Sequence, residues 1–395
     1  MIIGELCNST FADLTTPAND RVDGGAWPQT CAQSGRWVSA AGRACEHSDE
    51  KMPGCRRVEL CLFGPVMLIY NVTDRPEHGK AEYASDLVRR DCTRGEGSAR
   101  RYAAIIPTLN AADTLQRQVQ AILEQSVPPD VIIVIDSGSD DGTAELAASM
   151  PGVRLMSVKR GTFDHGGTRD MAIRASDTPF VILLTQDALP ADAHWAAAML
   201  APFGDERVAA VCGRQVARSD ARAYEKAVRA FRYPDESIVW NSADLPGLGV
   251  RGYLLSDVCA AYCRRAYDAV GGFEHPIATN EDMLIAADLL NAGYCLAYSA
   301  GARVWHSHNH TLKQEYLRNR LIGEFLVRYG DRFAQAGETG EGLRLVRHVS
   351  KELVCQGNPG ELLPFWLDCG ARLLGNRAGK RRGRRKAKAR SESNE

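Results

Sequence analysis

The alternation of apolar and helical segments between Tyr102 and Thr185 constrains the fold more than any other feature of this sequence. Four apolar runs, YAAIIP, VIIVID, VRLMSV and FVILLT, are separated by stretches with helical spacing, such as Leu115, Val119 and Ile122. Strands that are apolar along their length are typical of parallel sheets buried on both faces. Strands that alternate with helices indicate βαβ units. The sequence therefore predicts an α/β fold with a mostly parallel sheet and helices on both faces.

The remaining segments are predicted to flank this sheet. We expect a strand at 208–216 and helices at 222–233, 281–292, 312–329, 341–355 and 361–375. Residues 1–98 show little periodicity and are expected to form a disordered extension that catalysis does not need. The run KRRGRRKAKAR at 380–390 carries eight basic side chains and no acid. The predicted division is 1–98 extension, 99–332 main domain, 333–378 C-terminal helices and 379–395 basic tail.

Composition excludes several classes of protein. The formal net charge is −1, which argues against a general nucleic-acid-binding surface. No apolar run approaches the roughly 18–20 residues that cross a bilayer, and the N-terminus lacks the basic start of a signal peptide. Most of the cysteines stand singly in apolar runs, without the spacing of a metal finger. We therefore expect reduced thiols in a cytoplasmic protein.

Polar residues follow each of the four predicted parallel strands. The segments are Pro107–Asn110, Asp136–Thr143, Phe163–Arg169 and Thr185–Asp187. Ligands of open α/β sheets bind beyond the carboxyl ends of the strands, so these loops are the expected site. The absence of GxGxxG and of GxxxxGK[ST] argues against a dinucleotide fold and a P-loop. Asp187 ends an apolar run, and an ionised carboxylate there needs a partner to offset its burial.

Six short motifs occur in order between residues 102 and 310. They are IIPTLN, VIDSGSDDGT, FDHGGTRD, LLTQDALP, NEDM and VWHSHNH. Together they resemble the family 2 nucleotide-sugar glycosyltransferases, and in particular the bacterial rhamnosyltransferase-like branch. The resemblance implies an A-type glycosyltransferase fold with a nucleotide-binding sheet. It also implies a nucleoside-diphosphate sugar as donor and a glycan or lipid-linked sugar as acceptor.

The resemblance assigns most of the strand-end residues to the donor. The expected donor-binding residues are Pro107, Thr108, Asn110, Asp136, His165, Arg169 and Gln186. Asp136 is expected near the base or the ribose, and Arg169 is expected to help hold the diphosphate. Gly271–Phe273 resembles the family's Gly-Gly-Phe turn on the acceptor side. Asp257 is expected near the donor sugar or the acceptor.

The same resemblance implies a metal site at Asp187. This residue matches the last acid of the family's Asp-x-Asp motif, whose first acid is replaced here by Thr185. The implied partner of Asp187 is Mg²⁺ or Mn²⁺, which would bridge the donor's diphosphate, because hard oxygen ligands suit these ions. His306 and His308 share one face of a strand end, since side chains alternate with a period of two. The resemblance implies that a histidine here completes the metal site, and His308 is the expected ligand.

Glu281 and Asp282 open a predicted helix. Helix N-termini favour acids because of the dipole and the free N–H groups, so helix capping alone explains such a pair. The resemblance to the family's Glu-Asp motif implies instead that Asp282 is the catalytic base and that Glu281 orients the acceptor or the helix. The dipole is expected to keep Asp282 ionised and its proton affinity low.

The implied function is an inverting glycosyltransferase that moves a sugar, favouring a deoxyhexose such as rhamnose, in surface polysaccharide synthesis. Two alternatives stay open: a nucleotidyltransferase of similar sheet topology, and a non-catalytic nucleotide-sugar-binding relic, which the lost acid at Thr185 favours. An apolar patch beside the basic tail predicts peripheral contact with an anionic membrane surface, at the inner face of the cytoplasmic membrane. Its residues are Leu362, Leu363, Phe365, Trp366, Leu373 and Leu374.

Overall fold

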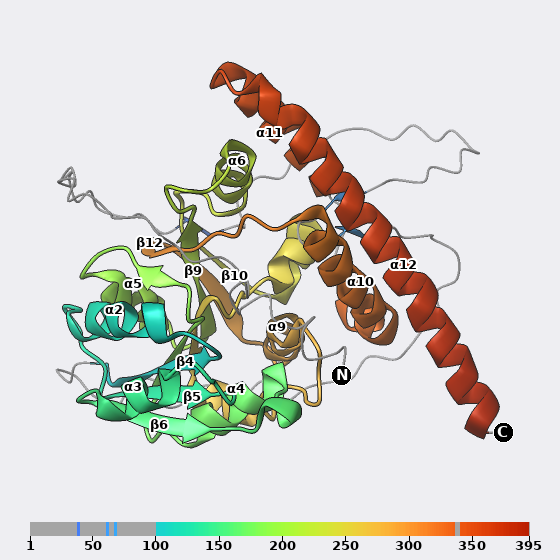
Figure 1. Cartoon of the computed structure of the whole chain (residues 1–395). Coiled ribbons are helices and arrows are strands. Elements are labelled where there is room, and N and C mark those ends of the chain that lie inside the picture. The colour runs from blue at the N-terminus through green and yellow to red at the C-terminus, as the bar shows by residue number, and fades with distance from the viewer. Residues whose placement is uncertain (1–37, 40–60, 63–66, 69–99, 336–339, 395) are drawn as a thin grey trace, which may run out of the picture.

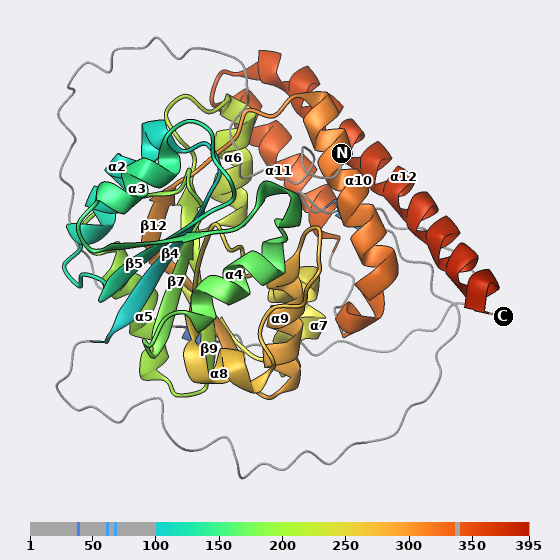
Figure 2. The same cartoon turned by 60° about the horizontal axis from the view of Figure 1, so that its bottom comes forward.

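The computed structural model describes residues 38–39, 61–62, 67–68, 100–335 and 340–394 (Figure 1). Its centre is one mixed sheet of ten strands, in the order β1-β10-β12-β9-β11-β7-β4-β5-β6, with β8 paired to β12. Helices pack on this sheet, and α10, α11 and α12 follow it towards the C-terminus (Figures 1 and 2). The predicted fold class is confirmed.

The parallel half of the sheet is the part predicted from the apolar runs. Its strands are β4 (Tyr102–Thr108), β5 (Val131–Asp136), β6 (Val153–Ser157) and β7 (Phe180–Leu184). They lie in the order β7-β4-β5-β6 and all pair in parallel. Their connections are α2 (Ala112–Leu123), α3 (Thr143–Ser149) and α4 (His165–Arg174). Every residue of β4 and β7 is buried, as expected for strands covered on both faces.

The other half of the sheet is mixed rather than mostly parallel. The strand predicted at 208–216 is present as β9 (Val208–Val216). β11 (Cys259–Cys263) lies antiparallel between β7 and β9. β12 (Cys295–Trp305) is parallel to β9 and antiparallel to β10 (Ile238–Trp240) and β8 (Leu189–Pro190). β12 therefore ends beside the β7 turn, which brings the histidines after Trp305 towards Asp187.

Three two-residue strands come from the N-terminal extension. β1 (Val38–Ser39) pairs with β10, while β2 (Cys61–Leu62) pairs with β3 (Met67–Leu68) in a separate sheet. The prediction of disorder for the rest of 1–98 lies outside the described residues. Cys212, Cys259, Cys263 and Cys295 are buried and form no disulfide within the described residues, as expected from their apolar surroundings.

The remaining helices are α5 (Trp195–Leu200), α6 (Ala223–Arg232), α7 (Leu245–Leu248), α8 (Arg264–Ala269), α9 (Glu281–Asn291), α10 (Leu312–Tyr329), α11 (Glu341–Cys355) and α12 (Leu362–Asn394). Of these, α6, α9, α10 and α11 follow the predicted bounds closely, α12 is longer than predicted, and the short helices α5, α7 and α8 were not predicted. α12 continues through the boundary expected between the C-terminal helices and the basic tail. Within the described part of the chain, no helix is both long and apolar enough to cross a membrane.

Close packing on α10 accounts for the length of α12. The two helices run side by side in both views (Figures 1 and 2). A Cβ atom on Gly375 or Gly379 would collide with the backbone oxygens of Tyr316 and Arg320 on α10. Glycine thus lets the backbones approach closely, and packing rather than intrinsic propensity stabilises a helix that contains several glycines. The pair forms one wall of the cavity described below.

Candidate active site

Asp187 lies in the turn that follows β7. Its Oδ1 accepts a hydrogen bond from Thr185 Oγ1 at 2.7 Å. Its Oδ2 lies 3.4 Å from His306 Nε2 and 3.2 Å from His308 Nε2. Burial alone would raise the pKa of Asp187, but the two histidines and the Thr185 hydroxyl hold it below its ordinary value. The carboxylate at the strand end therefore has partners, and Thr185 orients it.

Asp187, His306 and His308 have the geometry of a divalent-metal site. One ligand atom from each lies within 4.8 Å of the other two. His306 Nδ1 lies 3.0 Å from Gln215 Oε1, and its Nε2 is buried without a hydrogen-bond partner. A proton on Nδ1 would leave Nε2 free to ligate. Two imidazoles beside one carboxylate suit Mn²⁺ better than Mg²⁺, which prefers oxygen ligands.

A third histidine, His310, lies beside His308, and we call His306, His308 and His310 the histidine row. The His306 and His308 rings meet edge-on at 4.6 Å, and His308 stacks on His310 at 4.7 Å between centroids. Burial and the nearby Arg318 lower the pKa of His310 to about 4, so this ring is neutral at physiological pH. His308 was the predicted metal ligand, and no role was predicted for His310. The period-two spacing in HSHNH was the available signal for all three.

The expected donor residues at the ends of β4 and β5 hold one another in place. Asp136 accepts hydrogen bonds from the backbone N–H groups of Gly138 at 3.0 Å and Ser139 at 2.9 Å. It also accepts one from Thr108 Oγ1 at 3.3 Å. Asn110, whose φ of 53° is left-handed, accepts a hydrogen bond from a backbone N–H of the same loop at 3.0 Å. Asp136 and Asn110 thus shape this loop.

Gln186 joins the ends of β4 and β7. Its Oε1 accepts a hydrogen bond from Leu109 N at 2.8 Å, and its Nε2 donates to Leu109 O at 3.1 Å. Pro107 lies within β4 and is buried, as Gln186 is. Both residues therefore lie beneath the surface of this edge. We use the name donor edge for the set Pro107, Thr108, Asn110, Asp136 and Gln186.

Arg169 and His165, both on α4, are buried beside the start of α9. Arg169 Nη1 lies 3.0 Å from Glu281 Oε1 and 3.0 Å from His165 Nδ1. Its Nε lies 3.7 Å from Asp257 Oδ2. Burial disfavours the charge of Arg169, but the carboxylates of Glu281 and Asp257 raise its pKa above the ordinary value. Arg169 therefore ties α4 to two acids, in addition to any contact with a donor.

Asp282 is the second residue of α9 and lines the same pocket as Glu281. Its Oδ1 accepts a hydrogen bond from Met283 N at 2.8 Å. Burial and the neighbouring Glu281 raise the pKa of Asp282 to about 7. The expected low proton affinity was wrong, because burial beside a second acid outweighs the helix dipole. Burial also raises the pKa of Asp257, well above its ordinary range, and Asp282 adds to that shift.

The Gly271–Phe273 turn packs against the tyrosines next to Asp257. Gly271 and Gly272 have φ values of 90° and 83°, which glycine adopts without strain. Phe273 packs edge-on against Tyr262 at 5.6 Å and Tyr267 at 5.3 Å. Tyr262 in turn donates a hydrogen bond from its hydroxyl to an oxygen of the Asp257 carboxyl. The turn is thus part of the packing that holds Asp257 in place.

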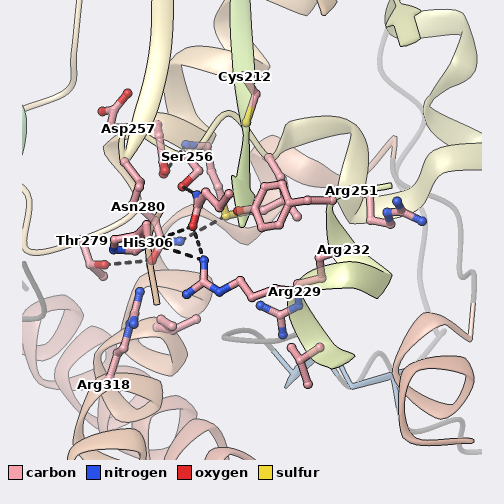
Figure 3. Close-up of a pocket in the computed structure, with 18 of the residues that line it drawn as sticks. Cys212, Arg229, Arg232, Arg251, Ser256, Asp257, Thr279, Asn280, His306 and Arg318 are labelled. Atoms are coloured by element: carbon pink, nitrogen blue, oxygen red, sulfur yellow. Dashed lines mark hydrogen bonds between the residues drawn. The ribbon is translucent and has the colours of Figure 1, made fainter. Parts of the chain in front are cut away.

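A cavity of about 310 Å³ lies between α4, α9 and the histidines that follow β12 (Figure 3). Its wall includes Arg169, Asp257, Glu281, Asp282, His306, His308 and His310. Further lining comes from α6 and α10. None of the donor-edge residues lines it. The donor edge and the cavity are thus different surfaces, with the histidine row on the cavity side.

Comparison with known proteins identifies the family to which this chain belongs. Residues 103–271 match the model of glycosyl transferase family 2. O-antigen chain rhamnosyltransferase RfbN of Salmonella typhimurium is 38% identical over 285 residues, which cover 70% of this chain and 88% of that protein. This chain belongs to glycosyl transferase family 2. It is a glycosyltransferase, as the order of its motifs predicted.

Two further proteins are similar to this family 2 glycosyltransferase. O-antigen chain rhamnosyltransferase WbaN of Salmonella anatum is 35% identical over 289 residues, covering 71% of this chain and 89% of that protein. A solved structure of the mannosyltransferase PcManGT from Pyrobaculum calidifontis, in complex with GDP-Man and Mn²⁺, is 20% identical with a TM-score of 0.46. That match covers 71% of this chain and 76% of the mannosyltransferase.

Proposed function

We propose that this glycosyltransferase is an inverting enzyme that transfers a deoxyhexose, rhamnose or a close analogue, from a nucleoside diphosphate to a glycan or lipid-linked acceptor in surface polysaccharide synthesis. The observation that carries the choice of sugar is the likeness to two O-antigen chain rhamnosyltransferases, over 88% and 89% of their lengths. Family membership disfavours the nucleotidyltransferase alternative. The cavity holds Glu281 and Asp282 and lies beside the cluster Asp187, His306 and His308, and this arrangement disfavours the non-catalytic alternative.

Asp282 acts as the general base in this proposal. A carboxyl with a pKa of about 7 is ionised in a large share of molecules at neutral pH and still has substantial proton affinity. The carboxylate takes the proton of an acceptor hydroxyl while that oxygen bonds to the anomeric carbon. The bond from that carbon to the diphosphate breaks, and the nucleoside diphosphate leaves from the opposite face. The anomeric configuration is therefore inverted.

Asp187, His306 and His308 would hold the divalent ion, with Mn²⁺ or Mg²⁺ as the candidates. An ion bound there supplies positive charge that stabilises the diphosphate leaving group. The chain's own residues prepare the site: Thr185 orients Asp187, and Gln215 contacts the far nitrogen of His306. A second histidine would offset the acid that is missing at Thr185, because it would supply a third protein ligand.

α12 is the proposed contact with an anionic membrane surface. Four apolar side chains that are 50–63% exposed lie on one of its sides: Leu363, Trp366, Leu367 and Leu374. The exposed basic residues Arg377, Arg381, Arg385 and Lys388 continue the same helical face at spacings of three and four. We call these eight residues the α12 stripe. An apolar half followed by a basic half suits a surface that is apolar below charged headgroups.

The predicted apolar patch is only partly exposed. Phe365 is buried against α6, where its ring lies 5.9 Å from that of Tyr224, so it is unable to enter a membrane. Leu362 and Leu373 are intermediate, while Leu367 is an exposed residue that the prediction left out. The helix thus sorts the apolar residues, with one set packing inwards and the other facing outwards.

A donor panel tests the proposed function. The full chain is incubated with a set of nucleoside diphosphate sugars that includes rhamnose, with and without Mn²⁺ or Mg²⁺, and nucleoside diphosphate release is measured. We expect release from the rhamnose donor, stimulated by metal and by a glycan acceptor, and a product of inverted configuration. Release from no donor under any condition would contradict the proposal, and a clear preference for another sugar would replace the deoxyhexose assignment.

A further inference from the structure

The charged groups of the cavity are unevenly paired, although its lining includes as many acids as arginines. Six arginines line the cavity, and four of them lie against acids. The pairs are Arg169–Glu281 at 3.0 Å, Arg229–Glu225 at 2.7 Å, Arg251–Glu341 at 3.1 Å and Arg372–Glu315 at 2.9 Å. The side chains of the other two, Arg232 and Arg318, make no hydrogen bond or ion pair within the described ranges, although Glu225 and Glu315 act on them electrostatically from a greater distance.

Arg232 and Arg318 carry charges that the protein itself does not neutralise by contact. They lie on α6 and α10, and Figure 3 places them along one side of the cavity, across from Asp257 and Ser256. Burial and the neighbouring Arg372 lower the pKa of Arg232 to about 10, and burial also lowers the pKa of Arg318. Holding partly buried cations without a partner costs free energy. An anionic ligand between them would remove that cost.

We propose that Arg232 and Arg318 form a second anion site, which binds a phosphate or diphosphate group that carries the acceptor sugar. Guanidinium groups are suited to this role, because their planar N–H donors match phosphate oxygens and retain their charge. The inference rests on the proposed function for the acceptor. The presence of the site itself rests on the two arginines alone.

The position of the pair favours the acceptor over the donor. The cavity that holds both arginines also holds Asp282, the proposed base, which an acceptor hydroxyl has to reach. The donor-edge residues line no part of that cavity, although Arg169, His306 and His308, which are proposed to serve the donor's diphosphate, do. Arg169 is paired with Glu281, and the two histidines lie against Asp187. Arg232 and Arg318 have no such pairing and lie on α6 and α10.

Arg318 comes from α10, which packs along α12 on the face that carries Gly375 and Gly379, away from the exposed stripe. α10 and α12 both contribute residues to the cavity, and α12 also carries the proposed membrane contact. A phosphate group carried by a membrane lipid therefore suits the site.

Two kinds of measurement test the site, with charge-matched controls. Arg232→Gln and Arg318→Gln remove one charge each from the cavity. Lys226→Gln on α6 and Lys313→Gln on α10 remove one exposed charge each from the same helices outside the cavity. The first measurement is titration of the metal-free full chain with inorganic diphosphate in excess chelator. The second is the KM for a prenyl-diphosphate-linked sugar, for the same sugar as a methyl glycoside, and for the donor.

We expect each cavity variant to weaken diphosphate binding, and to raise the KM of the diphosphate-linked acceptor, by about tenfold or more, as loss of a charge-assisted hydrogen bond predicts. The KM values of the methyl glycoside and the donor should stay within about twofold of wild type, as should all values of the controls. A raised donor KM with an unchanged acceptor KM would assign the arginines to the donor's diphosphate instead. Wild-type-like diphosphate binding by both cavity variants would overturn the anion site. If the wild type transfers no sugar at all, the proposed function fails, and the diphosphate titration still decides whether the site exists.

Discussion

The donor edge and the cavity use polar side chains in opposite ways. At the donor edge, Asp136 and Gln186 bind the backbone of neighbouring loops through several hydrogen bonds each. In the cavity, the side chains of Arg232 and Arg318 make no hydrogen bond or ion pair within the described ranges, and His310 Nε2 is buried without a hydrogen bond. Polar groups satisfied within the protein define its shape, whereas unsatisfied buried groups reduce stability and often mark a functional site.

This contrast predicts how substitutions divide between stability and activity. A change at the donor edge removes hydrogen bonds that shape the loops, so stability and donor affinity fall together. A change at an unsatisfied group of the cavity removes chemistry or ligand binding and leaves the fold nearly as stable. The predictions below test this division, from the largest expected effect to the smallest.

Asp187→Ala should give the largest loss of turnover. A metal ion is worth several kcal/mol of charge stabilisation in the transition state, so turnover should fall by about 10³-fold or more. Excess chelator should have a comparable effect on the wild type. The control is Asp220→Ala, which removes an exposed acid paired with Arg218 and should keep turnover within about twofold. Undiminished activity in excess chelator contradicts the metal site.

Glu281→Gln should act mainly on stability, although Glu281 lies in the cavity. It is paired with the buried Arg169, so its carboxylate is satisfied like a donor-edge group. The amide leaves Arg169 with Asp257 as its nearest acid, and we expect a loss of about 3 kcal/mol in the free energy of unfolding. Denaturant unfolding measures this loss. If the variant is as stable as wild type, the contrast between satisfied and unsatisfied groups does not hold within the cavity.

Gln186→Ala should destabilise the donor edge. Its amide makes two buried hydrogen bonds to the Leu109 backbone, and their loss should cost about 1–3 kcal/mol. The donor KM should rise as the loop loses its shape. The matched control is Gln120→Ala on α2, an exposed glutamine, which should change stability by less than about 0.5 kcal/mol. A raised donor KM with full stability would indicate direct donor contact instead.

Replacing Arg381, Arg385 and Lys388 of the α12 stripe with glutamine should have the smallest effect on the fold. All three are exposed, so the free energy of unfolding should change by less than about 0.5 kcal/mol per residue. Co-sedimentation with anionic vesicles should weaken by about 1 kcal/mol per residue removed, and salt should weaken it further. Neutral vesicles are the control, and equal binding to neutral and anionic vesicles counts against the membrane proposal.

The parallel half of the sheet was predictable because its strands are apolar along their length and alternate with helices. β11 was not, because CAAYC is short and rich in alanine, and its strand state depends on β7 and β9 on either side. The length of α12 was also hidden. Like charges at its end oppose a helix, but Glu324 pairs with Arg382 and Lys386, and glycine packing holds the helix on α10. Whether residues 1–98 are dispensable stays a prediction, which truncation near Ser98 would test.

The identities of the candidate catalytic residues were easier to predict than their electrostatics. Motif order pointed to Asp187, Asp282 and His308 before their contacts were known. The raised pKa of Asp282 depends on burial beside Glu281, which local sequence does not encode. Arg232 was equally hidden, because an arginine on an amphipathic helix normally faces solvent and is paired or hydrated there.

The titration of Asp282 should affect the stability of the protein and its activity in different ways. Its pKa is raised from 3.8 to about 7 in the fold, so the folded protein binds this proton more tightly than the unfolded chain does. Proton binding by Asp282 therefore stabilises the folded protein relative to its ionised form: this stability is fully present below pH 3.8 and is lost as the pH rises through about 7. Asparagine carries no charge, so Asp282→Asn should match or exceed the wild-type melting temperature at about pH 8.

The most direct test of the account is the pH profile of kcat/KM for wild type and Asp282→Asn. A base that titrates at about 7 is protonated below that pH, so the wild-type rate should rise up to neutrality and then level off. In Asp282→Asn, turnover should fall by about 10²–10⁴-fold, and kcat/KM should no longer rise with pH. The control is Asp288→Asn on the same helix, outside the cavity, which should keep both the turnover and the pH profile of the wild type. Near-normal turnover in folded Asp282→Asn, or an unchanged pH profile, would contradict the assignment of Asp282 as the catalytic base.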